Sequence, residues 1–186
     1  MGGAAASQNA GGSTPPATVK VWDPFVRIFH WSLAALVLIA FVTGDEAVLI
    51  HVAVGYAIVG LVAARILWGF IGPRHARFSD FVKSPTETLR YGAQAILARS
   101  PRYLGHNPLG GAMIVALLAM LLIICGGGYL LSTDAYWGDE TLKDVHEATA
   151  YLMLAMVGLH LAGVVWAAFV NRENLVKAMI TGRKPA

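Results

Sequence analysis

The sequence predicts an all-α integral membrane protein: a bundle of four transmembrane helices with an amphipathic helix in a cytoplasmic loop. The first supporting observation is composition, since 56% of the 186 residues are hydrophobic and only 13% are charged, a balance too apolar for an ordinary soluble domain. The second is length, because four apolar stretches can each cross a hydrocarbon core as a helix. These stretches are residues 24–43, 48–71, 108–131 and 145–170.

The third observation is the sorting of positive charge. With the N-terminus in the cytoplasm, Lys143 is the only one of the 14 lysines and arginines on the outer side. Cytoplasmic loops of membrane proteins carry the excess of Lys and Arg, so both termini are expected in the cytoplasm. The formal net charge of +3 therefore follows from topology, and we expect the basic residues to meet membrane lipid and not nucleic acid.

The chain begins with a segment of small residues. Residues 1–19 have neither the basic start nor the apolar core of a signal peptide, so we expect a disordered cytoplasmic tail. One four-helix domain follows over residues 20–186. The first membrane helix begins at Asp23-Pro24, a capping acid and a proline at the first helical position. Only residues 44–47 separate it from the second, which predicts an antiparallel hairpin.

The loop between the second and third membrane helices holds the amphipathic helix. Ser84-Pro85-Thr86-Glu87 is a capping box, and apolar residues at helical spacing follow it. This pattern predicts a helix on the inner membrane surface, with Arg90 and Arg99 toward lipid phosphates. Asn107-Pro108 then caps the third membrane helix. That helix carries no histidine and is expected to enclose a site without ligating, while residues 126–128, three glycines, are expected to loosen its outer end.

Four of the six histidines fall into two levels across the membrane. His146 and His160 are 14 residues apart on the last helix, a rotation of about 1400°, so both leave one face about 21 Å apart. His30 and His51 lie near the starts of the first and second helices, which enter the membrane from opposite sides. The predicted pairs are His51 with His146 at the outer level and His30 with His160 at the inner level.

Imidazole is costly in hydrocarbon unless it is paired or ligating, so these pairs predict two bis-histidine haems of the b type. Zinc fits less well, because it gathers four ligands at one centre. Buried histidines that only form hydrogen bonds are the alternative for each residue taken alone. His75 lies in a basic turn and is expected at the surface. His106 is interpreted as a hydrogen-bonded loop histidine, with a contact to a propionate or a quinone as the alternative.

Two further residues are candidates for cofactor binding. Gly55 lies one turn below His51 on the same face, where a missing side chain lets a flat macrocycle approach, and close helix packing is the alternative. Arg65 is expected to pair with a haem propionate, and snorkelling of its side chain to the inner interface is the alternative.

Several short motifs resemble those of the bacterial cytochrome b561 and nickel-iron hydrogenase b-type cytochrome family. They are Arg27-Ile28-Phe29-His30-Trp31, His51-x-x-x-Gly55, Gly105-His106-Asn107-Pro108-Leu109-Gly110, His146-Glu147, His160, and residues 174–184. The resemblance covers about residues 20–185. It implies a four-helix di-haem protein of the bacterial inner membrane, with His30, His51, His146 and His160 in the axial ligand positions.

The resemblance also implies electron exchange with the quinone pool, either ubiquinone or menaquinone, and with a hydrogenase, a reductase or a periplasmic c-type cytochrome. With both axial positions filled by histidine no coordination site is open, so we expect outer-sphere electron transfer. Whether the chain is itself an enzyme stays open, since a superoxide:quinone oxidoreductase is the alternative function. The outer loops, however, should repel superoxide and favour a basic partner such as a cationic c-type cytochrome. Their acidic residues are Asp45, Glu46, Asp134, Asp139, Glu140, Asp144 and Glu147, against one Lys143.

Overall fold

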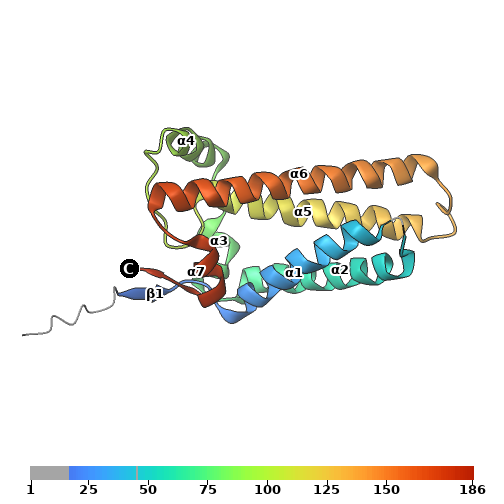
Figure 1. Ribbon diagram of the computed structural model, residues 1–186, viewed down its shortest axis with the longest axis horizontal. Coiled ribbons are helices and arrows are strands. Elements are labelled where there is room, and N and C mark those ends of the chain that lie inside the picture. Colours follow the sequence, from blue (N-terminus) through green and yellow to red (C-terminus); the bar gives the residue numbers. More distant parts are fainter. Residues whose placement is uncertain (1–16, 45) are drawn as a thin grey trace, which may run out of the picture.

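Four long helices run side by side along the molecule in the computed structural model, which describes residues 17–44 and 46–186 (Figure 1). The predicted tail falls mostly outside these described residues, as does Asp45. The four are α1 (Pro24–Thr43), α2 (Val48–Ile71), α5 (Pro108–Leu131) and α6 (Glu140–Asn171). Each is long and apolar enough to cross a membrane, as predicted.

Side-chain caps explain where these helices begin. The carboxylate of Asp23 accepts from the Val26 backbone N–H at 3.1 Å, and the Asn107 side chain accepts from Gly110 N–H at 2.7 Å. Both caps lie at the predicted starts. The last helix begins earlier than predicted, at Glu140, because Asp139 caps it through Leu142 N–H at 2.9 Å. The first turn of this helix is polar, so a prediction based on apolar residues places the start too late.

The helices pack as two antiparallel hairpins, α1 with α2 and α5 with α6, joined where α2 meets α5. A small apolar core lies between them, formed by Phe29, Ile58, Val62, Leu118, Leu121 and Met153. Large apolar side chains elsewhere on the four helices are exposed along their lengths. Such an outer surface suits contact with lipid tails.

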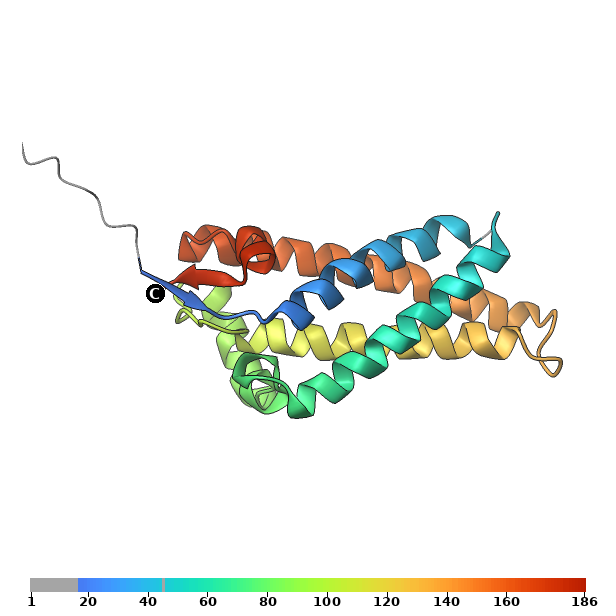
Figure 2. The same ribbon diagram turned by 90° about the horizontal axis from the view of Figure 1, so that it is seen from below.

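The two ends of the bundle differ in construction. Within the described part of the chain, one end, here called the loop end, holds the α1–α2 turn and the α5–α6 loop. The other, here called the terminal end, holds the smaller elements that the structure describes (Figure 2). These are β1 (Thr18–Lys20), the short 3-10 helix η1 (Arg74–Ala76), α3 (Phe78–Phe81), α4 (Pro85–Ile96), α7 (Leu175–Thr181) and β2 (Arg183–Pro185).

Two of these elements bear on the sequence predictions. Strands β1 and β2 pair antiparallel, with Thr18 opposite Pro185, so the predicted disordered tail reached too far, to residue 19. Sequence patterns miss such a ribbon because three-residue strands show no clear alternation and their partners lie at opposite ends of the chain. Helix α4 begins as predicted, since the Ser84 hydroxyl accepts from Glu87 N–H at 3.2 Å.

Candidate metal centres

The four membrane histidines lie in two pairs at different heights in the bundle. Toward the loop end, the rings of His51 on α2 and His146 on α6 have their centres 6.0 Å apart, at an interplanar angle of 79°. Toward the terminal end, His30 on α1 and His160 on α6 have ring centres 6.5 Å apart, at 51°. These are called the loop-end pair and the terminal-end pair. The partners are the ones that helix spacing predicted.

The spacing of each pair fits one metal ion between two imidazoles. Each metal–nitrogen bond is about 2.0–2.1 Å and each nitrogen lies about 1.1 Å from its ring centre, so two axial rings stand about 6.3 Å apart. Among the described residues no hydrogen bond joins the two rings of either pair, and no group of three or more His, Cys, Asp or Glu gathers in one place. Two nitrogens per level suit the axial positions of a haem better than a closed zinc site.

Polar contacts of the ring nitrogens support the same fit. His51 Nδ1 lies 2.8 Å from the backbone oxygen of Ala40 on α1, so it donates to that carbonyl and leaves Nε2 with a free lone pair. The Nδ1 atom of His30 is buried without a partner among the described residues. Buried nitrogens of this kind are expected to find a partner, which a bound group can provide.

Glycines of α5 allow His146 to lie against that helix. A Cβ built on Gly128 would stand 3.1 Å from Cε1 of His146, and one on Gly127 would stand 3.5 Å from its Nδ1. Helix α5 continues unbroken to Leu131, so the expected loosening at residues 126–128 does not occur. The glycines provide a close approach instead. Their place near the loop end of α5 was a sequence signal for this role, which sequence reasoning missed.

Gly55 is half-buried, yet a Cβ added to it would meet nothing within 4 Å. No described neighbouring side chain or backbone therefore requires a glycine at this position. Its carbonyl lies 3.9 Å from the sulfur of Cys125, which places its backbone beside α5. Open space next to a half-buried glycine one turn below His51 fits a flat group at the loop-end level.

Arg65 is buried toward the terminal end, with only 3% of its surface exposed. Its guanidinium carbon lies 5.4 Å from the ring centre of Phe78 and 5.8 Å from that of Phe81. One terminal nitrogen, Nη1, has no hydrogen-bond partner among the described residues. The side chain does not reach solvent, so the snorkelling alternative is not supported. A buried guanidinium with an unused hydrogen-bond donor is stabilised when an anion binds to it.

His106 lies beside this arginine, just before α5. Its ring centre is 4.4 Å from that of Trp22 and 5.3 Å from that of Phe81, and it makes no side-chain hydrogen bond within the described part of the chain. It is thus packed among aromatic rings and is not the hydrogen-bonded loop residue expected. Burial, together with the cations Arg65 and Lys184, lowers the pKa of His106 to about 3.

His75 also departs from its prediction as a plain surface residue. Its Nδ1 lies 3.1 Å from the Asp80 carboxylate, and the side chain is three-quarters buried. Sequence spacing did not show this pairing because it depends on how η1 and α3 turn relative to each other.

The loop end presents acidic and aromatic side chains. The described acids of this end are all exposed: Glu46, Asp134, Asp139, Glu140, Asp144 and Glu147. Trp137, at the tip of the α5–α6 loop, is 81% exposed. An exposed tryptophan within an acidic surface is a typical anchor for a protein partner.

Comparisons with known proteins point to one family. The family model described as prokaryotic cytochrome b561 matches residues 21–182. The chain is 24% identical to a probable Ni/Fe-hydrogenase B-type cytochrome subunit of Bradyrhizobium diazoefficiens, over 90% of this chain and 86% of that protein. It is 23% identical to a protein of the same description from Rhodobacter capsulatus, over 90% and 81% of the two chains. No solved structure gives a significant match.

Proposed function

The chain belongs to the prokaryotic cytochrome b561 family, and from that membership we propose that it carries two b haems and conducts electrons across the bacterial inner membrane. Membership makes it a b-type cytochrome, a membrane protein of electron transfer that holds haem b. The proposal of two haems rests chiefly on one observation. Two histidine pairs lie at separate heights, with ring centres 6.0 and 6.5 Å apart.

We assign one haem to each pair, whose two histidines would hold it. Helix α6 contributes one ligand to each level, His146 and His160, while α2 provides His51 and α1 provides His30. The bond from His51 to the Ala40 carbonyl fixes its ring and leaves Nε2 as the nitrogen that can bind a metal. A bound haem supplies one-electron chemistry, and the protein supplies its placement, its spacing and the exclusion of water.

Two more residues are assigned to cofactor binding. Gly55 leaves room beside the loop-end level, where a side chain would obstruct a flat ring. Arg65 stands 14 residues after His51 on α2, the same interval that separates His146 from His160 on α6, so it lies at the terminal-end level. Its unpartnered Nη1 is suited to a propionate carboxylate.

The orientation and the partners follow from charge. We place both termini in the cytoplasm, which puts the acidic loop end in the periplasm. A partner with a basic docking surface fits that end, and the relatives are named as hydrogenase subunits. We therefore propose that electrons pass between a periplasmic redox protein, of the hydrogenase or c-type cytochrome kind, and the quinone pool. Superoxide oxidation is the less favoured alternative, because the exposed acids at the loop end repel an anion.

The primary test is the haem content of the detergent-purified protein. A pyridine haemochrome assay with a reduced-minus-oxidised spectrum should give two b haems per chain. A single haem would contradict the assignment of both pairs, and absence of haem would overturn the proposal. Reduction of both haems by a quinol then tests the quinone link, and reduction by superoxide tests the alternative.

A further inference from the structure

A pocket of about 410 Å³ opens at the terminal end, between α4 and the segment that leads from α4 to α5. It lies outside the two histidine levels and has no part in the function proposed above. Its lining includes Glu87, Arg90, Tyr91, Gln94, Arg99 and Tyr103. The pocket is mostly polar, with two guanidinium groups, two phenols and one amide against a single carboxylate.

The walls of this pocket are fixed to the bundle. Helix α4 is attached to α6 by a hydrogen bond of 2.9 Å from Trp166 Nε1 to the Ala95 carbonyl. It also contacts α5, where Leu109 lies 3.6 Å from the position of a Cβ on Gly92. The buried ring of Tyr91 meets the ring of Tyr103 edge-on, with their centres 5.6 Å apart.

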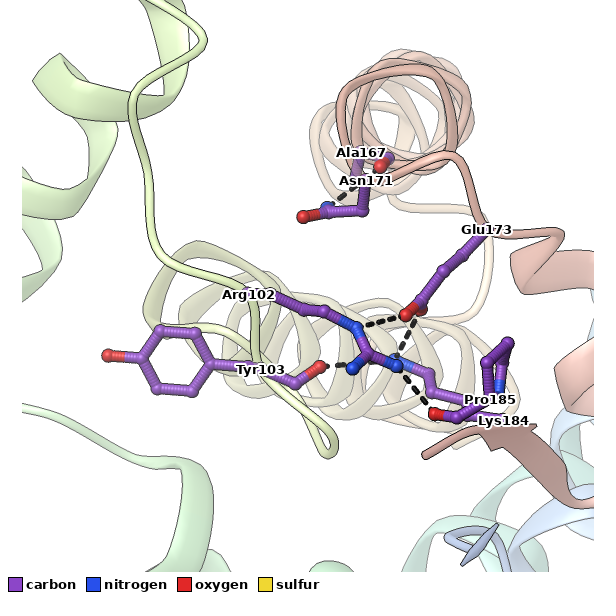
Figure 3. A network of polar contacts seen from close by, with 7 residues as sticks. All are labelled: Arg102, Tyr103, Ala167, Asn171, Glu173, Lys184 and Pro185. Atoms are coloured by element: carbon purple, nitrogen blue, oxygen red, sulfur yellow. Dashed lines mark hydrogen bonds and ion pairs between the residues drawn. The ribbon is translucent and has the colours of Figure 1, made fainter. Parts of the chain in front are cut away.

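The wall that carries Tyr103 is held by a polar network that includes the buried side chains of Glu173 and Lys184 (Figure 3). Arg102 donates to the Glu173 carboxylate and to the Pro185 carbonyl, the latter at 2.6 Å. Lys184 lies 3.7 Å from the same carboxylate and donates to the Tyr103 carbonyl at 3.4 Å. The Tyr103 ring points away from this network. Its backbone is therefore anchored while its side chain is free to line the pocket.

The two arginines of the pocket are available to a ligand. Arg90 and Arg99 are exposed, and within the described residues neither forms a side-chain hydrogen bond or an ion pair. Glu87 is the only acid of the lining, so the site keeps a net positive charge. Paired guanidinium groups with phenol and amide donors match the oxygens of a phosphate.

Exposed apolar residues in a stripe on one side of α4 indicate that the phosphate belongs to a lipid. Leu89, Ile96 and Leu97 are 75%, 77% and 63% exposed, and they lie on one side of the helix. Arg90 is seven residues before Leu97, which places it about 20° from Leu97 around the helix, at the polar edge of the stripe. An in-plane helix buries such a stripe among acyl chains and keeps its polar edge at the level of the headgroups. Interfacial Trp166 lies at the same end.

We propose that this pocket binds the phosphate headgroup of an anionic phospholipid, with Arg90 and Arg99 on the phosphate and the acyl chains along Leu89, Ile96 and Leu97. Binding at this site joins α4 to the inner leaflet. A free phosphate offers the same oxygens but leaves the apolar stripe uncovered.

The test uses the full-length protein, with Arg90→Gln and Arg99→Gln combined in one variant. A matched variant combines Lys20→Gln and Lys177→Gln, which removes the same charge from exposed side chains of the terminal end outside the pocket. Native mass spectrometry after delipidation measures binding of added phosphatidylglycerol, phosphatidylcholine and inorganic phosphate. Haem content is measured on each sample, so that loss of fold or of cofactor is seen separately.

We expect wild type and the lysine variant to bind phosphatidylglycerol alike, and the arginine variant to bind it about tenfold or more weakly, because each hydrogen bond to a charged group is lost. Equal affinity in the arginine and lysine variants would overturn the proposal. So would equal affinity for phosphatidylcholine, or inorganic phosphate that competes as strongly as the lipid.

Discussion

The loop-end and terminal-end histidine pairs lie in one bundle but differ in what surrounds them. Beside the loop-end pair are glycines of α5, the open space at Gly55 and a surface of exposed acids. Toward the terminal end lie a buried arginine, a histidine packed among aromatic rings, and a cap built from the two ends of the chain. The two histidine pairs are therefore similar, but negative charge lies near the loop-end pair and positive charge lies near the terminal-end pair.

This difference in charge should set the relative reduction potentials of the two haems, and with them the direction of electron transfer. Negative charge near a haem favours the oxidised state and positive charge favours the reduced state, so surroundings tune the potential even where the axial ligands are identical. The acids lie at the loop end and the buried cation Arg65 lies toward the terminal end. We expect the terminal-end haem to have the higher potential, which would draw electrons from a periplasmic donor toward the cytoplasmic side.

The largest expected effect comes from removing a ligand, which separates the two levels. His51→Ala or His146→Ala should remove the loop-end haem alone, and His30→Ala or His160→Ala the terminal-end haem alone. A pyridine haemochrome assay should then give one haem per chain in place of two. His75→Gln, a change of a histidine outside both pairs, should keep both haems. Loss of both haems from every single variant, with the fold intact, would contradict the independence of the two levels.

A second effect should be confined to the loop end. Gly128→Val places side-chain atoms where His146 lies, since even a Cβ there would stand 3.1 Å from the ring. We expect most of the loop-end haem to be lost and the terminal-end haem to be kept. Gly126→Val is the matched control, because a Cβ at Gly126 meets nothing within 4 Å. The spectrum of the remaining haem measures both results, and equal haem loss in the two variants would argue against the contact.

Sequence reasoning reached further for the membrane helices and their caps than for the smaller elements of the terminal end. Asp23 and Asn107 gave the starts of two helices because a cap is a local feature of the chain. The interval from His146 to His160 gave two levels because helical rotation is regular. Local pattern and period are sufficient for such features, and the four spans follow from them.

The strand pair, the ion pairs and the buried arginine of the terminal end depend on contacts that no local pattern contains. Strand β1 meets β2 from the far end of the chain, and Arg102 meets Glu173 across 71 positions. The burial of Arg65 depends on where α3 places Phe78 and Phe81. The sequence named Arg65 as a candidate but left snorkelling open, because both outcomes suit an arginine near the end of a membrane helix.

A third prediction concerns the potential of the terminal-end haem. Arg65→Gln removes the buried cation, so that potential should fall by on the order of tens of millivolts, while the loop-end haem keeps its value. Arg65→Lys should retain much of the difference. Arg74→Gln is the control, since that side chain is 85% exposed at the same end of the bundle. A redox titration that resolves the two haems measures the shifts, and equal shifts of both would refute the placement of Arg65.

The smallest effect is a dependence of stability on pH at the terminal end. The pKa of His106 is lowered to about 3 in the folded protein, against about 6.5 for an unperturbed histidine. Between these values the unfolded chain binds more protons at this group than the folded one. The contribution of His106 to stability is therefore complete above about pH 6.5 and is lost as pH falls toward 3, by at most about 1.4 kcal/mol per pH unit.

Replacing His106 should remove this dependence of stability on pH and leave the loop-end haem unchanged. In His106→Phe the ring stays packed against Trp22 and Phe81 but has no proton to gain. We expect the apparent melting temperature of wild type to fall more steeply than that of His106→Phe between pH 7 and pH 5. Because burial is the main cause that lowers this pKa, with the cations Arg65 and Lys184 adding to it, an equal slope in His106→Phe and wild type would contradict the buried, cation-flanked position of His106.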